Sequence, residues 1–438
     1  MLHFNTDLYE LKREIVSFSK KLTSFASKAH QKFVLDMIYG IFHSKSTLLS
    51  DISRSLLEDT KLSYTIDRLS TNLTSIDKET SDQLMHQYHQ QVKKFLPKEP
   101  ILLFDDSDIS KPYGKKFEDL DRVIDGSSLK KETVNGYHVC EAVALTAKEK
   151  QPISLYSHIY SCTSDGFKSK NEYTIQSIDT ARKVIGEKTK CTMVFDRGYD
   201  SVKIINKVDD RFVSEKTGKL EAGYTRFVLR LKENRNFIFK GKTKKVGDIV
   251  RNRKGKVKMT LWFDNQEKHD VYISHTRAIL PNNKREYTIV IVYGLSEDKP
   301  MVLLTNDKMK SKEDVIRIVR CYFYRWRVEE YFRVKKQEYG FENMRVRSLQ
   351  GMNQLNQILT FVLGKIGMLS EEIESRLLSM KIKVRSEAIK NRVCFWYYQI
   401  ARGMQKILMH AKVGVKEYQR IEKRRRWGQL QFKLEYIE

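Results

Sequence analysis

The stretch Ile101-Leu102-Leu103-Phe104-Asp105-Asp106-Ser107 decides the fold class, because a short apolar run stops abruptly at two acids. It follows Pro97 and Pro100, where the preceding helical pattern ends. An apolar run of this length is typical of a buried strand. Strand-like runs follow at residues 137–145, 153–160, 193–195 and 227–231, with helical patterns before and after 193–195. Strands that alternate with helices predict an α/β core.

The regions around this core have different patterns. Residues 8–96 show apolar residues at helical spacing with almost no glycine, which predicts a helical domain. Within it, residues 48–73 fit either a helix-turn-helix capped by Ser50 and Ser63 or a plain helical bundle. Residues 236–293 are lysine-rich and contain several β-like runs, so we expect a β-rich insertion. A strand at 301–304, a long helix from about Glu313 and further helices from Gln354 complete the pattern.

The chain carries a large positive charge. Its 438 residues include 81 Lys and Arg against 55 Asp and Glu, a formal net charge of +26. This charge points to a polyanionic partner such as nucleic acid, although a basic surface that only aids solubility has the same composition. Hydrophobic residues make up 40% of the chain, so we expect two or three globular domains.

The cysteines and the apolar segments indicate the cellular compartment in which the protein is expected. Five scattered cysteines contain no Cys-x-x-Cys pair, so their spacing predicts neither a disulfide framework nor a structural zinc site. Such cysteines suit a reducing cytosol. No stretch approaches about eighteen uninterrupted apolar residues, and residues 1–5 lack a signal pattern, so we expect neither membrane insertion nor secretion.

Three acids form the candidate chemical centre. Asp105 and Asp196 each follow an apolar strand, where a side chain can leave the sheet edge and face a ligand. Glu329 lies on the expected later helix. Together such carboxylates can hold two divalent cations, which prefer oxygen ligands and leave positions open for water and phosphate. Taken singly, an acid at a strand end is more often a turn or cap residue.

The helix around Glu329 is more specific. At about 100° per residue, Arg325, Glu329 and Lys336 all fall within about 60° of Tyr322 on one helix face. A face of phenol, guanidinium, carboxylate and ammonium is a poor core stripe, but it suits phosphates bound around a metal ligand. An ordinary ion pair four residues apart explains Arg325 and Glu329 and leaves the other two unexplained.

These residues resemble the DDE transposases of bacterial insertion sequences that carry a Tyr-Arg-Glu-Lys signature. The signature is matched by Tyr322-Phe323-Tyr324-Arg325-Trp326-Arg327-Val328-Glu329-Glu330 followed by Lys336. Phe195-Asp196-Arg197-Gly198-Tyr199 is similar to the second aspartate motif of that family, and Asp105-Asp106-Ser107 to the first. At the first motif Asp106 and Asp108 are close alternatives, and the Asp-x-Ser/Thr pattern favours Asp105.

The resemblance covers roughly residues 103–348 and implies a ribonuclease-H-like catalytic core with a β-rich insertion, flanked by helical regions. The expected parts are a helical DNA-binding domain (1–96), the core in two parts (97–235 and 301–350), the insertion (236–300) and a helical C-terminal region for DNA binding or dimerisation (351–438). The implied activity is metal-dependent excision and strand transfer of an insertion sequence in a bacterial cytoplasm.

The resemblance also implies roles for single residues. Asp105, Asp196 and Glu329 would be the catalytic ligands of two Mg²⁺ ions, which Mn²⁺ can replace. Contacts to DNA are expected from Tyr322, Arg325, Lys336, Arg333 and Arg197. The implied partners are the terminal inverted repeats of the transposon, the target DNA and a second copy of the chain in a homodimer.

Other interpretations remain open at this point. A nuclease on the same core would cleave DNA without joining it to a target, whereas a regulator derived from a transposase would only bind DNA. Met301 stands where some relatives hold a flipped base against a tryptophan, which argues against a stacking pocket. The basic run from Lys423 to Trp427 suits either phosphate binding or a solvated chain end. For His138, beside the turn signal Asn135-Gly136, we expect a structural role.

Overall fold

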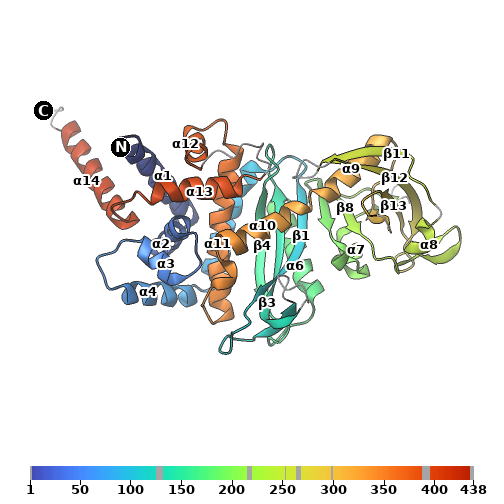
Figure 1. Cartoon of the computed structure of the whole chain (residues 1–438), viewed down its shortest axis with the longest axis horizontal. Helices are drawn as coiled ribbons and strands as arrows, with labels where there is room; N and C mark the ends of the chain where they lie inside the picture. The colour runs from blue at the N-terminus through green and yellow to red at the C-terminus, as the bar shows by residue number, and fades with distance from the viewer. Residues whose placement is uncertain are drawn as a thin grey trace.

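A large mixed sheet runs through the centre of the molecule, with helices from both ends of the chain packed together beside it (Figure 1). The computed structural model describes residues 2–124, 132–214, 220–251, 253–262, 268–296, 299–386 and 395–434. The expected class, an α/β fold with a central sheet and flanking helices, is confirmed. Each helix in the described ranges is too short or too polar to cross a membrane.

Twelve strands form the sheet in the described part of the chain. Their order is β10-β9-β12-β13-β14-β8-β5-β1-β3-β2, with β4 paired to β3 and β11 paired to β12. Strand β5 runs parallel to both β1 and β8, and the other pairs are antiparallel. The strands are β1 (Ile101–Ser110), β2 (Asp121–Ile124), β3 (Thr133–Leu145), β4 (Pro152–Tyr160), β5 (Cys191–Phe195), β8 (Thr225–Arg230), β9 (Asn236–Phe239), β10 (Lys242–Lys245), β11 (Val257–Trp262), β12 (Lys268–Ile279), β13 (Glu286–Tyr293) and β14 (Met301–Thr305). A separate small hairpin joins β6 (Phe212–Val213) and β7 (Leu220–Glu221).

Helices cover both faces of the sheet, and the N-terminal and C-terminal regions of the chain are helical. The N-terminal helices are α1 (Leu2–Leu22), α2 (Lys28–Ser44), α3 (Leu49–Ser55), α4 (Leu62–Ser75) and α5 (Lys78–Val92). The central ones are α6 (Lys170–Ile185), α7 (Val202–Val208), α8 (Val246–Val250), α9 (Lys312–Phe323) and α10 (Trp326–Arg333). The C-terminal ones are α11 (Leu349–Glu371), α12 (Leu377–Arg385), α13 (Tyr397–Leu408) and α14 (Val415–Leu434). Single turns lie at η1 (Lys93–Phe95), η2 (Arg197–Tyr199), η3 (Val334–Glu338) and η4 (Phe341–Asn343).

Helix α11 joins the helical body to the sheet. Almost its whole length is buried, as expected for a helix that is apolar around its circumference. It packs on β4 and also on α2, α4, α5 and α13, so N-terminal and C-terminal helices share one core. The caps expected in the N-terminal helices are wrong. The N-cap residues of α3 and α4 are Leu48 and Lys61, each two residues before the expected serine and without a side-chain cap.

Strand β1 is longer than its apolar run. Pairing with β3 continues from Leu102 opposite Ala144 as far as Ser110 opposite Gly136, whereas the parallel partner β5 stops at Phe195. The expectation that Asp105 follows the strand is therefore wrong, since Asp105 lies inside β1 opposite Glu141. The strand continues because β3 supplies hydrogen bonds along its whole length.

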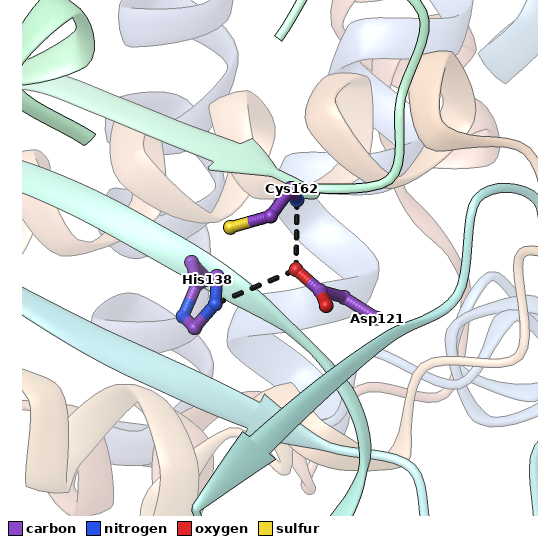
Figure 2. Close-up of side chains that lie close together, drawn as sticks. All are labelled: Asp121, His138 and Cys162. Atoms are coloured by element: carbon purple, nitrogen blue, oxygen red, sulfur yellow. Dashed lines mark hydrogen bonds and ion pairs between the residues drawn. The ribbon is translucent and has the colours of Figure 1, made fainter. Parts of the chain in front are cut away.

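The edge formed by β2, β3 and the end of β4 carries polar side chains. His138 on β3 lies beside Asp121 and Cys162 (Figure 2), and its Nδ1 is hydrogen-bonded to Oδ1 of Asp108 on β1, 2.6 Å away. Helix α6 packs on this face of β3 and β4. Helix α10 contacts β1, and α11 contacts β4, from the other face.

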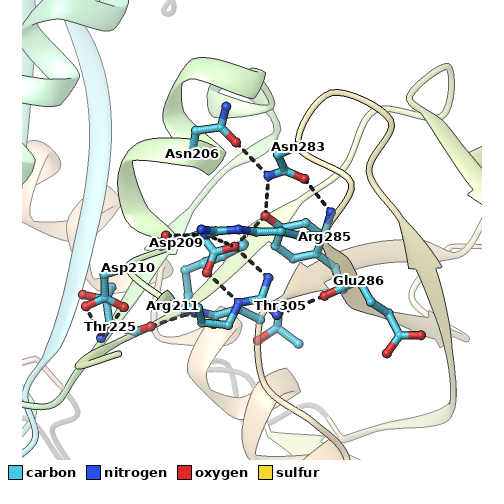
Figure 3. A network of polar contacts seen from close by, with 12 residues as sticks. Asn206, Asp209, Asp210, Arg211, Thr225, Asn283, Arg285, Glu286 and Thr305 are labelled. Carbon is cyan, nitrogen blue, oxygen red and sulfur yellow. Dashed lines mark hydrogen bonds and ion pairs between the residues drawn. The ribbon is translucent and has the colours of Figure 1, made fainter. Parts of the chain in front are cut away.

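The insertion strands continue the main sheet through the pairing of β13 with β14. A buried carboxylate holds this junction together (Figure 3). Asp209, just after α7, accepts two hydrogen bonds of 2.7 Å from Arg211 and one of 2.6 Å from Tyr287 on β13. Burial alone would raise the pKa of Asp209, but these donors lower it, so the residue stays ionised. The insertion is thereby attached to the α7–β8 connection.

A buried ion pair ties α1 to the C-terminal helices. Glu14 on α1 accepts hydrogen bonds from Lys365 of α11 and from Arg376 at the start of α12. Burial would raise the pKa of Glu14, but its two cationic partners lower it to about 2. Its folded pKa therefore lies below the unfolded value of about 4.3. The stabilisation is complete above the unfolded pKa and is lost as the pH falls toward about 2.

Replacing Glu14 with Gln is expected to lower the free energy of unfolding by about 3 kcal/mol at pH 7, and the loss should shrink steadily below about pH 4.5. Protonated Glu and Gln have the same shape, so the two proteins should converge in acid. Urea unfolding at a series of pH values measures the difference. The control is Glu10→Gln on the same helix, whose more exposed pair with Lys381 should contribute less than about 1 kcal/mol. A loss for Glu14→Gln that does not vary with pH would contradict the assignment.

Candidate active site

The register of two parallel strands brings Asp105 and Asp196 together. Phe104 on β1 lies opposite Phe195 on β5, and their rings stack with centroids 4.7 Å apart. Asp196 is the first residue after β5, as the sequence predicts. Asp105 is the next residue of β1, so both carboxylates lie where the parallel pairing ends.

Glu329 reaches the same place from the first turn of α10. The expected single helix from Tyr322 to Lys336 is wrong, because α9 ends at Phe323, and a tighter turn intervenes in which the N–H of Arg325 donates to the carbonyl of Tyr322. A π-helical turn, Val334–Glu338, then follows α10. A wheel of 100° per residue therefore does not hold across the whole segment.

One guanidinium stands between the three carboxylates. Arg325 lies 2.6 Å from Glu329 (Nη2 to Oε1) and 3.5 Å from Asp105 (Nη1 to Oδ2). Its Nε lies 3.9 Å from Oδ1 of Asp196 and is buried without a hydrogen-bond partner in the described part of the chain. The Arg325 side chain is 17% exposed, so this charge is screened only partly by water.

The carboxylates influence one another electrostatically. Burial raises the pKa of Asp105 to about 7, and the negative charges of Asp196 and Glu329 add to that rise while Arg325 opposes it. Burial also acts to raise the pKa of Asp196, but Arg325, the N–H of Arg197 and the Tyr322 hydroxyl together lower it. The cluster thus gathers more negative charge than one guanidinium can balance.

Two further side chains contact Asp196. The buried Tyr322 donates a hydrogen bond of 2.9 Å from its hydroxyl to Oδ1. Arg230 at the end of β8 places Nη1 4.0 Å from the same oxygen. Sequence reasoning missed Arg230, although its position at the carboxyl end of the strand beside β5 was a usable signal.

The remaining predicted residues contact other partners or solvent rather than the three acids in the described part of the chain. Lys336 places Nζ 3.3 Å from Oε1 of Glu342, and Arg333 pairs with Glu330. Arg197 is exposed directly after Asp196. Along β1 successive side chains alternate in direction, so Asp106 points away from the face on which Asp105 meets Arg325.

The donor set fits divalent cations. It offers three carboxylates and no sulfur or imidazole ligand among the residues described above, which suits hard ions that take oxygen ligands. The raised pKa of Asp105 and the single buried guanidinium show that the site favours additional positive charge. Asp105, Asp196 and Glu329 are the residues that would hold such ions.

Comparisons with known proteins agree with this chemistry. A family model described as "Transposase DDE domain" matches residues 96–363, more than half of the chain. Among curated proteins there is no match. A crystal structure of the NurA nuclease from Sulfolobus solfataricus aligns with 12% identity over 70% of this chain and 99% of that chain, but its TM-score of 0.27 is too low to inform the fold. The chain belongs to the Transposase DDE domain family, and it is a DNA transposase, a metal-dependent enzyme that cleaves DNA.

Proposed function

We propose that this transposase belongs to the insertion-sequence type with the Tyr-Arg-Glu-Lys signature, and that Asp105, Asp196 and Glu329 are its catalytic residues. The observation that carries the proposal is the meeting of all three carboxylates at Arg325. We assign them two Mg²⁺ ions, with Mn²⁺ as a substitute. Excision and strand transfer of a bacterial insertion sequence in the cytoplasm is the activity we infer.

A ribonuclease-H-like core is the fold we infer for residues 97–235 and 301–350. The strand order β4-β3-β1-β5-β8, with the first three strands antiparallel and the last three parallel, supports it. In this arrangement the insertion, 236–300, separates the two parts of the core. Its strands lengthen the sheet beyond β14.

DNA is the substrate, and positive charge indicates where it binds. When bound, the divalent ions offset the negative charge that develops on the phosphoryl group during strand cleavage. Tyr322 fixes Asp196 through its hydrogen bond, and Arg325 balances the acids until the ions bind. Arg197 follows Asp196 directly, and Arg333 and Lys336 follow Glu329 along α10 and the next turn, so these three cations are our candidates for phosphate contacts.

The helical parts, 1–96 and 351–438, are candidates for recognising the terminal inverted repeats. A groove of about 1130 Å³ lies between α1, α5 and α14, and several cations line it. These are Arg13, Lys20, Lys21, Lys94 and Lys423. Lys423 begins the basic run that ends at Trp427, and the side chains from Arg425 onward lie outside the described residues. Pairing of two transposon ends by a homodimer is the assembly we infer, with target DNA as the second substrate.

Replacing Glu329 with Gln should reduce Mg²⁺-dependent cleavage more than about 100-fold, since even the partners of metal ligands contribute 10- to 100-fold. Binding to DNA that carries the flanking inverted repeats should stay nearly intact, because the amide keeps the shape. Gel-shift, cleavage and strand-transfer assays on one DNA measure the three steps.

Asp105→Asn should lose cleavage likewise, and Asp106→Asn on the opposite face is the matched control. A more severe defect in the Asp106 variant would move the role to that residue, and cleavage without joining by the wild type would favour a nuclease.

Replacing Arg325 with Met should increase the stabilisation of the folded protein by Mg²⁺. Without the guanidinium, an ion no longer has to displace a bound cation, and each tenfold gain in affinity adds about 1.4 kcal/mol at a fixed excess of ion. Thermal unfolding with and without Mg²⁺ gives the comparison. Arg333→Met, at the other end of α10 and about two turns from Arg325, should respond as the wild type does. Equal responses of all three proteins would show that Arg325 does not stand in the place of the ions.

Replacing Lys336 with Ala should weaken binding to transposon-end DNA and make the slope of log affinity against log salt shallower by up to about one unit. The loss of one phosphate contact is the physical reason. The binding slope is measured across a salt series, with Lys299→Ala as control because that lysine of the insertion already pairs with Glu233. If Lys336 only pairs with Glu342, the slope stays unchanged and stability falls by about 0.5 kcal/mol or less.

A further inference from the structure

Three potential metal ligands converge outside the candidate active site. Asp121 begins β2, His138 lies on β3 and Cys162 follows the end of β4. One donor atom from each lies within 4.8 Å of the other two. Figure 2 shows the three side chains close together, with Cys162 just beyond the end of its strand.

Strand register explains this convergence. Asp121 lies opposite Gly136, two residues before His138 on the same strand. His138 in turn lies opposite Tyr160, two residues before Cys162. Because side chains two residues apart point to the same face, the three donors share one face of the sheet.

The imidazole of His138 is oriented as in histidine ligands of metals. Its Nδ1 lies 2.6 Å from Oδ1 of Asp108, and its Nε2 lies 3.5 Å from Oδ2 of Asp121. A carboxylate that binds one ring nitrogen of a metal-bound histidine fixes the tautomer and the direction of the other nitrogen. With the proton on Nδ1, the lone pair of Nε2 faces a carboxylate oxygen, and a cation between the two would be attracted by both.

The other two ligands have suitable charge and surroundings. Burial would raise the pKa of Asp121, but the N–H groups of Cys162 and Arg122, at 2.7 and 2.6 Å, lower it and keep the carboxylate ionised. Burial, together with Asp121, raises the pKa of the Cys162 thiol to about 11, so without a metal this thiol is protonated and an ion has to displace its proton. Tyr160 lies beside the His138 ring, at 5.4 Å between centroids, and shields that side from water.

We propose that Asp121, His138 and Cys162 bind one zinc-like divalent ion, with Asp108 holding the histidine in place. A thiolate, an imidazole and a carboxylate form a set that Zn²⁺ accepts in tetrahedral geometry with one position left for water. On binding, the Sγ–H bond of Cys162 breaks, an Sγ–metal bond forms and the proton leaves to solvent, with no change of oxidation state.

The ion would stabilise the strand that carries the active site. Asp108 is three residues beyond Asp105 on β1, and it connects that strand to His138. Mg²⁺ does not favour sulfur or imidazole ligands, so the two sites would select different ions. The proposed site is therefore distinct from the ions used in DNA cleavage, and Asp108 is its link to the strand that carries Asp105.

Cobalt tests the site in the full-length protein after treatment with a chelator. Titration with Co²⁺ should give one equivalent of a tetrahedral spectrum with a thiolate-to-cobalt charge-transfer band. One equivalent of Zn²⁺ should remove the band, and excess Mg²⁺ should not. Cys162→Ser should lose the band, while Cys191→Ser, which alters a buried cysteine on β5, should keep it. No band in the wild type, or a band that survives in Cys162→Ser, overturns the proposal.

A second measurement needs no substitution and so does not depend on the folding of a variant. Zn²⁺ should slow alkylation of Cys162 in the wild type by at least about tenfold, as read by peptide mass mapping, because a metal-bound thiolate is not free to react. Equal alkylation of Cys162 with and without Zn²⁺ overturns the proposal. That result would favour a polar cluster in which His138 contacts Asp108 and Asp121 without a metal.

Discussion

A single guanidinium joins the parts of this protein that the candidate chemistry requires. Arg325 contacts acids from β1, from the end of β5 and from α10, which are far apart in sequence. Its position depends on two features of the fold. The stacked pair Phe104–Phe195 fixes the register of the parallel strands, and the tight turn between α9 and α10 aims the arginine back at the sheet. A shift of either strand by one residue would turn one carboxylate to the opposite face.

Local sequence patterns predicted the helices and strands better than they predicted which strands pair with one another. The apolar run 101–104, the strand before Asp196 and the helices near Glu329 all exist, because each is set by nearby residues. The position of Asp105 was wrong because it depends on distant pairing: β1 continues past Asp105 because β3 is long. The pairing of β13 with β14, which joins the insertion strands to the main sheet, also depends on distant partners. The contact of Arg230 with Asp196 likewise depends on the pairing of β8 with β5, although a cation at the carboxyl end of a strand was a signal in the sequence.

The Asp121, His138 and Cys162 cluster shows the same limit for metal ligands. Spacing rules find ligands that lie a few residues apart on one turn or helix, and by that criterion the scattered cysteines predict no zinc site. Here the antiparallel pairing of β2 with β3 and of β3 with β4 brings the three residues together. Asp121 and His138 are 17 positions apart in the sequence, and His138 and Cys162 are 24 positions apart. The alternation of side chains between the two faces of a sheet, rather than distance in the sequence, decides which side chains meet.

The two faces of the β1–β3 pair therefore differ in chemistry. On one face Asp105 lies with Arg325, and Glu141 forms a fully buried pair with Lys335, with Nζ 3.0 Å from Oε2. That face offers oxygen ligands, and its buried lysine makes a second cation near Glu141 unnecessary. The opposite face offers imidazole and sulfur through His138 and Cys162. Because successive residues of a strand point to opposite faces, two sets of ligands with different ion preferences can lie on the same pair of strands without competing.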